Sequence, residues 1–345
     1  MNARIQRLRR KSFEATPRIS IERALIETEF YKKHQGQHSI PVLRALVFKE
    51  LCTKKTIYIG DDELIVGERG PFPKSVSTFP ELTCHTAEDL CTLNNRAMTR
   101  FKISDEDIDR YEKEVIPFWQ GRSMRDRVFS QIPEAWVNAY QAGLFTEFME
   151  QRAAGHTTLD NTIYQKGMLD FKNDIALALA RLDFLDDKEA AQKAEELRAM
   201  DIACDAAIVF AERHADLAAE KAAHEKDPQR RQELKAIAAV CRQVPAHAPK
   251  NLHQALQMYW FVHLGTITEL NGWDAMNPGR LDQHLFPFFQ QEMADGTLTR
   301  EKAKELISCL WVKVNNHPAP PKVGVTAKER HAPPFVQDGE FDVFT

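Results

Sequence analysis

The sequence predicts a helix-rich α/β protein that forms one large domain. Segments whose apolar residues recur three and four positions apart dominate the 345 residues. Strand-like segments are few and far apart, and the chain contains no repeat of fixed period and no low-complexity tract. The length alone suggests two domains, at about 150 residues each. Helices with sparse, separated strands nevertheless fit one large α/β domain better than two small ones.

The first expected helices lie in the N-terminal half. Residues 19–26 (ISIERALI) have helical periodicity and are expected to open a helix. Ser104 is an expected N-cap because three acidic residues follow it, and Pro117 limits that helix. Farther along, large side chains repeat every four positions and predict an aromatic stripe that ends near Gly155. These residues are Trp136, Tyr140, Leu144 and Phe148.

Two further helices are expected in the C-terminal half. Residues 188–225 contain neither Gly nor Pro, so they are expected to form one long helix that breaks at Asp227-Pro228. Its predicted buried face consists of Leu197, Met200, Cys204, Ile208 and Ala211. Thr299 is an expected N-cap for a helix that carries Leu306, Ile307, Leu310, Trp311 and Val314. Strands are expected only at residues 56–59, 64–66 and 323–326, where β-branched residues gather.

The composition narrows the functional class. Hydrophobic residues make up 43% and charged residues 28%, which is usual for a globular protein with a buried core. A net charge of −4 gives no electrostatic case for nucleic acid or an anionic membrane. Six cysteines without a CxxC pair indicate reduced thiols, and no apolar run is long enough to span a bilayer. These features predict a cytoplasmic protein that acts on small molecules or protein partners, with an exposed basic helix at its N-terminus.

Common catalytic signatures are missing from the sequence. It contains no dinucleotide-binding glycine motif, phosphate loop, Gly-x-Ser-x-Gly or His-Glu-x-x-His. Cys84, His85 and Cys91 are three metal-type ligands without matching partners, and ordinary cysteines are the simpler interpretation. No metal or nucleotide cofactor is therefore predicted.

One candidate site lies in residues 145–157 (FTEFMEQRAAGHT), where a helix with aromatic residues ends in a Gly-His step. Phe148 can form the wall of a pocket, and His156 can donate a proton to a leaving oxygen. In the alternative interpretation Phe148 belongs to the core and His156 forms a hydrogen bond at the helix end.

A second candidate lies in residues 271–283 (NGWDAMNPGRLDQ), between the apolar segments 255–262 and 285–289, both of which are expected to be buried. Asp274 stands beside Trp273 and is expected in a desolvated setting, where a carboxylate must be paired or change its pKa. Such a group can bind a substrate cation or transfer a proton. The alternative is structural: Asn277 is an N-cap, Pro278 the first helical residue, and Arg280 and Asp282 are exposed charges of the first turn.

Five segments, taken in order, resemble the N-terminal part of glycyl radical enzymes of the pyruvate formate-lyase type. They are residues 19–24, 63–68, 145–157, 260–283 and 311–324. The phrases IPVLRAL, FTEFMEQRAAGHT and PAPPKVG are most similar to the subgroup that dehydrates trans-4-hydroxy-L-proline. The resemblance covers about residues 5–329, and it implies part of a ten-stranded α/β barrel wrapped in helices.

The same resemblance implies a chemistry. Phe148, His156 and Asp274 match residues that line the substrate pocket of the subgroup. A cysteine thiyl radical takes a hydrogen atom from the carbon beside the ring nitrogen, and the neighbouring hydroxyl leaves as water to give pyrroline-5-carboxylate. The cofactor implied is a glycyl radical, which a radical S-adenosylmethionine activating enzyme installs. Asp274 is expected to pair with the ring ammonium, and His156 to assist departure of the hydroxide.

The sequence departs from the family after residue 329. Residues 1–329 are interpreted as the N-terminal part of the pyruvate formate-lyase-like domain, and residues 330–345 as an unrelated tail of the kind that a frameshift or truncation produces. The family's Cys-x-Glu loop and its radical-storing glycine loop are not found in this sequence. The expectation is that this chain alone is inactive.

Three alternatives stay open. The alternative activity is that of isethionate sulfite-lyase or of another glycyl radical lyase that acts on a diol or an amino alcohol. For isethionate, Arg152 is a candidate cation for the sulfonate, although Arg152 is more typical of a helix-end surface charge. The chain can also be a subunit that is completed by a separately encoded C-terminal half, or a non-catalytic scaffold. A homodimer is the expected oligomeric state from the resemblance.

Overall fold

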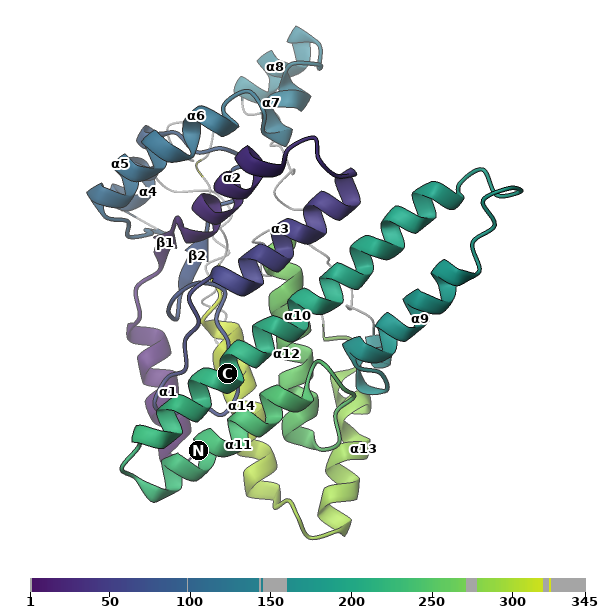
Figure 1. Ribbon diagram of the computed structural model, residues 1–345. Coiled ribbons are helices and arrows are strands. Elements are labelled where there is room, and N and C mark those ends of the chain that lie inside the picture. Colours follow the sequence, from purple (N-terminus) through teal and green to yellow (C-terminus); the bar gives the residue numbers. More distant parts are fainter. Residues whose placement is uncertain are drawn as a thin grey trace.

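The computed structural model describes residues 2–97, 99–142, 144, 160–270, 278–318 and 323. Helices dominate this part of the chain, as the sequence predicts (Figure 1). The first elements are α1 (Ala3–Glu14), β1 (Arg18–Ser20), α2 (Glu22–His34), α3 (Ile40–Lys54), β2 (Ser75–Ser77), α4 (Ala87–Asn95), α5 (Asp105–Glu114), α6 (Ile116–Trp119), α7 (Met124–Phe129) and α8 (Glu134–Gln141). The later elements are the 3-10 helix η2 (Asp160–Tyr164), α9 (Met168–Ala180), α10 (Ala190–His224), α11 (Pro228–Gln243), α12 (Leu252–Glu269), α13 (Leu281–Ala294) and α14 (Arg300–Asn315).

The larger of two hydrophobic cores lies around α12. The long helix α10 packs against α3, α9 and α11, while α12 lies behind it next to α13 and α14 (Figure 1). Almost every side chain of α12 is buried, from Leu252 to Thr268, so this helix has no solvent-exposed face. The prediction that residues 255–262 are buried is confirmed. The prediction for residues 285–289 is wrong, because Leu285 is buried but Phe286 is 56% exposed.

The smaller core joins α2, α4, α5 and α6 to the two strands. β1 and β2 form a parallel pair in which Ile19 is opposite Val76, and both of these side chains are buried. The remaining helices of this group, α7 and α8, continue from α6 at the top of the molecule (Figure 1). This arrangement separates the N-terminal helices α4–α8 from the core around α12.

The strands predicted at residues 56–59 and 64–66 are wrong, because residues 56–68 form an irregular coil with a turn at residues 61–62 and a bend at residues 64–65. Its backbone groups bond to side chains of helices instead of a neighbouring strand. The amide of Gln257 accepts a hydrogen bond from Val66 N and donates one to Val66 O, both at 2.9 Å. Trp260 Nε1 donates to Gly67 O at 2.9 Å. The β-branched residues therefore did not predict the structure of this segment, and they did not indicate which groups satisfy its backbone.

Gly67 is required in this coil. Its φ is +109°, and a Cβ atom there would lie 2.7 Å from Cδ1 of Leu264. Both the backbone conformation and the close approach of α12 therefore need a residue without a side chain.

Several helix predictions are confirmed. The long helix appears as α10, and Ser104 and Thr299 cap α5 and α14 by accepting from backbone N–H groups. Within α10, Cys204 and Ala211 are buried as predicted, but Met200 is 53% exposed.

Other helix boundaries differ from the predictions. The helix expected from residue 19 begins at Glu22, because residues 18–20 pair as β1. α13 begins at Leu281 with Arg280 at its N-cap position, so Pro278 is not its first residue. In the described part of the aromatic stripe only Tyr140 is buried, while Trp136 and Leu144 are exposed.

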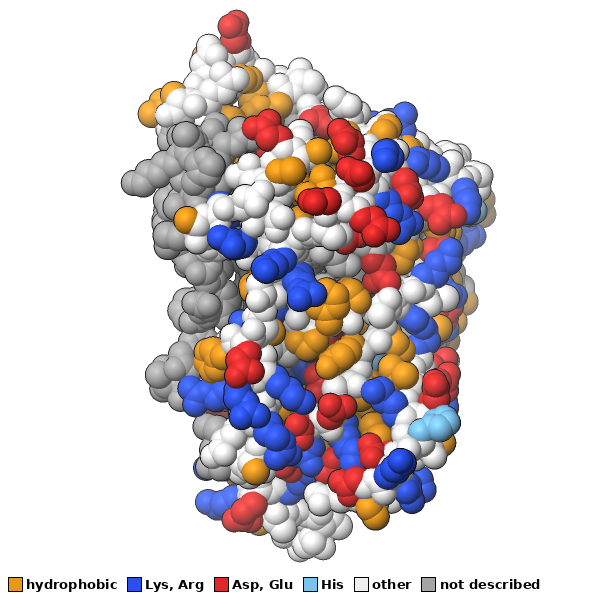
Figure 2. Space-filling model, turned by 90° about the vertical axis from the view of Figure 1, so that its left-hand side faces the viewer, with side chains coloured by type: hydrophobic (Ala, Val, Ile, Leu, Met, Phe, Trp, Pro, Cys, Tyr) orange, Lys and Arg blue, Asp and Glu red, His pale blue; other side chains and the backbone are white. Residues whose placement is uncertain are grey.

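The face formed by α1 and the strands carries many charges. Figure 2 shows Lys and Arg side chains gathered on its lower part, mixed with acidic residues, below a group of hydrophobic side chains. Arg7, Arg10 and Lys11 of α1 are exposed, which confirms the predicted basic N-terminal helix. Among the described helices, none is long and apolar enough to cross a membrane.

Candidate functional site

The three site residues predicted from the sequence, Phe148, His156 and Asp274, lie outside the described residues. Arg152 and Asn277 lie outside them as well. Their roles therefore stay predictions. The structure does describe the elements that flank the two segments. The segment 145–157 lies between α8 and η2, and the segment that carries Asp274 lies between α12 and α13.

The described flanks of these two segments lie next to each other. Asp160, four residues after His156, has Oδ1 3.4 Å from Nε2 of His284 in the first turns of α13. The Tyr164 ring lies 5.5 Å from the His284 ring and 6.3 Å from that of Phe288, measured between centroids. η2 also packs against α12. The chain therefore leaves the segment 145–157 at η2, next to the point where it leaves the segment 271–283 at α13.

Three polar atoms at this junction have no hydrogen-bond partner among the residues that the structure describes. They are the hydroxyls of Tyr164 and Tyr259 and Nδ1 of His284. Both tyrosines are almost fully buried, at 8% and 4% exposure, and burial raises the pKa of both phenols, so both are neutral. Buried polar atoms without partners are rare in folded proteins and call for an explanation.

A closed ion cluster connects α14 to the coil of residues 56–68. Lys313 Nζ lies 2.5 Å from Glu63 Oε1 and 2.8 Å from Glu68 Oε1, and all three side chains are buried. Burial lowers the pKa of Lys313, but the two carboxylates outweigh it and hold that pKa above its usual value. Burial raises the pKa of Glu63 in spite of the ammonium beside it. The ammonium therefore stays charged and fixes the coil to α14.

Polar side chains extend this closed cluster on two sides. Asn316 Nδ2 donates to Glu68 Oε1 at 3.1 Å, and Ser12 Oγ of α1 donates to Asn316 Oδ1 at 2.6 Å. On the other side, His317 Nε2 lies 3.4 Å from Glu68 Oε2. Burial, and then the charges of Arg69 and Lys313, hold the pKa of His317 well below its usual value, so its ring is neutral.

A second ion cluster lies beside a groove between α2, α3 and α7. Arg23 donates to Glu27 Oε2 at 2.6 Å and, through both terminal nitrogens, to Glu81 at 2.7 and 3.1 Å. Its Nε donates to the carbonyl of Thr268 at 2.9 Å, and its guanidinium lies 4.0 Å from the centre of the Phe79 ring. Burial raises the pKa of Glu27 well above its usual value. The groove has a volume of about 990 Å³ and is lined by all three charged residues.

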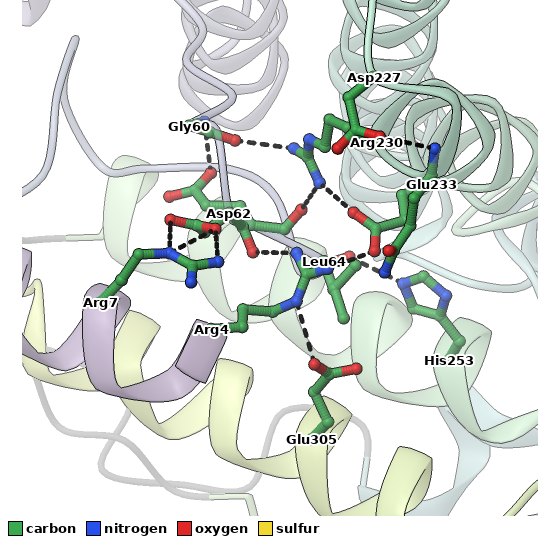
Figure 3. A network of polar contacts seen from close by, with 12 residues as sticks. Arg4, Arg7, Gly60, Asp62, Leu64, Asp227, Arg230, Glu233, His253 and Glu305 are labelled. Atoms are coloured by element: carbon green, nitrogen blue, oxygen red, sulfur yellow. Dashed lines mark hydrogen bonds and ion pairs between the residues drawn. The ribbon is translucent and has the colours of Figure 1, made fainter. Parts of the chain in front are cut away.

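A third network positions α1 against the coil (Figure 3). Arg4 donates to Asp62 O at 2.8 Å and to Glu305 of α14 at 3.0 Å, and it also pairs with Glu233 of α11. Arg230 donates to Glu233 at 3.1 Å and reaches two carbonyls of the coil. The network connects four separate parts of the chain, so its role is to fix their relative positions.

The structure holds no obvious metal site in the part it describes. No group of three His, Cys, Asp or Glu side chains converges there closely enough to bind an ion. Cys84 is half-buried and Cys91 exposed, and the other four cysteines are buried.

Comparison with known proteins decides the family. The pyruvate formate lyase-like family matches residues 1–338. The chain belongs to this family. Among its relatives, trans-4-hydroxy-L-proline dehydratase of Clostridioides difficile is 52% identical over 326 residues, which are 94% of this chain and 41% of the relative. Isethionate sulfite-lyase of Nitratidesulfovibrio vulgaris is 33% identical and covers 88% of this chain and 38% of its own length.

Solved structures of family members have the same fold. The crystal structure of hydroxyproline dehydratase from Clostridioides difficile with trans-4-hydroxy-L-proline bound matches 95% of this chain with a TM-score of 0.91 and 51% identity. A glycerol-bound glycerol dehydratase from Clostridium butyricum matches 93% with a TM-score of 0.85 and 30% identity. The pyruvate formate lyase-like chain described here spans about 42% and 40% of these two proteins, which fits the predicted match to their N-terminal part. The predicted helix-rich α/β fold of the family is confirmed. The boundary at residue 329 stays a prediction.

The sequence interpretation assigned no chemistry to the buried charges. Lys313 stands between Trp311, Val312 and Val314, and a lysine inside an apolar helical run is a signal of a buried ion pair. Its partners Glu63 and Glu68 lie about 250 residues away in the chain, so no local pattern identifies them. Nothing in the sequence marks Tyr164 and Tyr259 as functional residues, because both fit the pattern of core positions.

Proposed function

We propose that this chain is the part of a glycyl radical dehydratase that binds trans-4-hydroxy-L-proline. The supporting observation is the likeness to the dehydratase of Clostridioides difficile, at 52% identity over 94% of the chain and a TM-score of 0.91 to the substrate-bound structure. Identity to the isethionate enzyme is much lower, at 33%, so isethionate is the weaker candidate. The complete reaction in this proposal is dehydration to pyrroline-5-carboxylate.

The proposal gives each predicted site residue a role. The carboxylate of Asp274 pairs with the ring ammonium of the substrate, because a charge-assisted hydrogen bond both neutralises and orients a cation. His156 donates a proton to the departing hydroxide, and Phe148 forms an apolar wall that excludes water. The contact between Asp160 and His284 supports this proposal, because it brings the ends of the two site segments together.

The cysteines of this chain do not fit the thiol that abstracts hydrogen. Cys52, Cys204, Cys241 and Cys309 are buried in helices, and none of the six cysteines stands in a Cys-x-Glu motif. We therefore derive no radical step through this chain. In the proposal, the thiol and the glycyl radical belong to polypeptide of the kind that the relatives have beyond the matched 41%.

Three partners belong to the same proposal. A radical S-adenosylmethionine enzyme activates the assembled protein, a polypeptide with the C-terminal part of the fold completes the barrel, and two such units form a homodimer. A cytoplasmic location is proposed with them. A chain that binds no substrate and no such polypeptide would instead be a scaffold.

Substrate binding can be measured on the chain itself by isothermal titration calorimetry. Trans-4-hydroxy-L-proline is expected to bind, and isethionate is not. Asp274→Asn is expected to weaken binding about tenfold or more, because it removes a charge-assisted hydrogen bond. Asp282→Asn is a matched control, since Asp282 is an exposed carboxylate in the first turn of α13, and its affinity should stay within about twofold. Equal affinity of Asp274→Asn and the wild type would contradict the assigned role.

Radical formation provides a separate test. The purified chain, incubated with an activating enzyme and S-adenosylmethionine under anaerobic conditions, is expected to give no glycyl radical signal in electron paramagnetic resonance. Addition of a polypeptide that carries the Cys-x-Glu and glycine loops is expected to restore the signal and the consumption of hydroxyproline. A radical signal from the chain alone would overturn this part of the proposal.

A further inference from the structure

The junction of η2, α12 and α13 holds three buried polar atoms that lack partners within the described part of the chain. Tyr164 comes from η2, Tyr259 from α12 and His284 from α13. Each residue is held in place by other contacts. The Tyr164 ring packs against those of His284 and Phe288, and the Tyr259 ring stacks on that of His263 with 5.9 Å between centroids.

The free-energy cost of burying polar atoms without hydrogen-bond partners argues for a ligand. Transfer of a hydroxyl from water to an apolar interior without a hydrogen bond is unfavourable, and folded proteins avoid it in nearly all cases. Here the Tyr164 and His284 rings lie 5.5 Å apart, and Tyr259 belongs to α12, against which η2 packs. Phenylalanine would fill the two tyrosine positions with the same ring and without this cost. Their position beside both predicted site segments therefore points to a use outside the packing of the core.

The contact with Asp160 orients the His284 ring. Nε2 of His284 lies 3.4 Å from the Asp160 carboxylate, so a proton on Nε2 faces that acceptor, and in this tautomer Nδ1 can accept a hydrogen bond. A tyrosine hydroxyl can both donate and accept. The three atoms together therefore complement a group that has an N–H or O–H donor as well as an oxygen acceptor, such as a hydroxyl or an amino acid.

We propose that Tyr164, Tyr259 and His284 form a polar subsite that binds a small hydroxylated or amine-bearing ligand. The identity of that ligand as trans-4-hydroxy-L-proline rests on the proposed function, because η2 and α13 adjoin the two segments of the predicted substrate site. The subsite itself rests on the described residues. Within the proposed function, these residues determine which hydroxylated amino acids are accepted.

Conservative variants test the subsite. Tyr164→Phe and Tyr259→Phe remove only the hydroxyl, and each is expected to weaken the binding of trans-4-hydroxy-L-proline at least fivefold in calorimetry. Their urea midpoints should be equal to or above that of the wild type, because an unpartnered buried hydroxyl does not stabilise the fold. Tyr111→Phe is the matched control: the Tyr111 hydroxyl is also buried without a partner in the described part of the chain, but it lies in the smaller core, so its removal should leave the affinity within about twofold.

Glycerol and L-proline serve as additional probes, so each result has one meaning. If hydroxyproline binds and both phenylalanine variants bind it as well as the wild type, the subsite is wrong and the proposed function stands. If hydroxyproline fails to bind, but glycerol or proline binds and Tyr164→Phe and Tyr259→Phe weaken that binding, the subsite stands and the proposed substrate is wrong. If no probe binds, or if the two variants lose stability, the subsite is overturned.

Discussion

The two buried ion clusters contain the same charges but differ in their exposure to solvent. Each places one cation against two carboxylates, so each carries a net charge of −1 when all groups are ionised. In the closed cluster Lys313 and its partners Glu63 and Glu68 are each at most 6% exposed. In the other cluster, the Glu81 side chain is 19% exposed and a groove of about 990 Å³ runs beside Arg23. The first cluster can only hold the fold together, whereas the second can respond to the solution.

The difference extends to the groups around the clusters. Neutral histidines surround the coil that the closed cluster fixes: His214 lies near Gly67, His253 Nε2 bonds Leu64 O at 2.8 Å, and His317 lies beside Glu68. Each cluster also holds a buried carboxyl whose pKa is raised, Glu63 in the closed cluster and Glu27 in the groove cluster. Acid protonates a buried neutral histidine, and alkali ionises a buried neutral carboxyl. The histidines around the coil are therefore expected to lower stability in acid, whereas Glu27 is expected to lower it as the pH rises.

The largest expected effect follows from removal of the closed cluster's cation. Lys313→Met leaves Glu63 and Glu68 buried without a counter-charge. Loss of one partner from a buried ion pair costs about 3–5 kcal/mol, because the remaining charge stays desolvated. The free energy of unfolding from urea titrations at pH 7 should fall by that amount.

An exposed pair serves as the control for this change. Lys33 and Glu29 are 2.5 Å apart on α2, with side chains 60% and 59% exposed, and Lys33→Met should change stability by less than about 1 kcal/mol. A similar small effect for Lys313→Met would mean that the closed cluster is open to water in solution.

The closed cluster also shows what sequence patterns can and cannot predict. The helix at residues 190–224 was predicted because its periodicity and its lack of Gly and Pro are local properties. Residues 56–59 and 64–66 were predicted as strands because β-branched residues gather there, and the prediction is wrong because these residues belong to a coil. The partners of that coil, Gln257 and Trp260, lie about 190 residues away, so the pattern gave no sign of them.

The candidate site was predictable to a different extent. Phe148, His156 and Asp274 came from the resemblance and from local context, and they stay predictions because they lie outside the described residues. The contact between Asp160 and His284 depends on how η2 and α13 pack, which is a tertiary property. The hydroxyls of Tyr164 and Tyr259 matched core positions in the sequence, and only their missing partners in the structure mark them out.

An intermediate effect is expected from acid. Burial lowers the pKa of His214 and His263 to about 3 and that of His253 to about 4, while the unfolded chain titrates near 6.5. The unfolded state therefore binds more protons below pH 6.5, so stability is fully present above that pH and is lost as the pH falls toward the folded values. Between pH 7.5 and 5.5 each histidine should cost about 1 kcal/mol.

One substitution isolates a single histidine in this titration. His253→Gln keeps an N–H donor for Leu64 O but removes the titrating ring, so the drop in unfolding free energy should shrink by about 1 kcal/mol. His224→Gln changes an exposed histidine and should leave the drop unaltered. If both variants lose stability in acid as steeply as the wild type, the neutral histidines are not the cause.

The smallest expected effect concerns Glu27 in the groove cluster, and it has the opposite sign. Burial raises the pKa of the folded carboxyl, although Arg23 opposes this, while the unfolded carboxyl titrates near 4.5. The folded state therefore binds more protons above pH 4.5, and this group's contribution to stability falls as the pH rises. Glu27→Gln cannot ionise, so the stability of the wild type relative to this variant should decline between pH 4.5 and 7.5, by about 1 kcal/mol or less because Arg23 offsets the charge. Urea midpoints across this range measure the difference. A relative stability that instead rises with pH would mean that Arg23 keeps Glu27 ionised, and the groove cluster would then be a second structural ion pair and not a group that responds to solution.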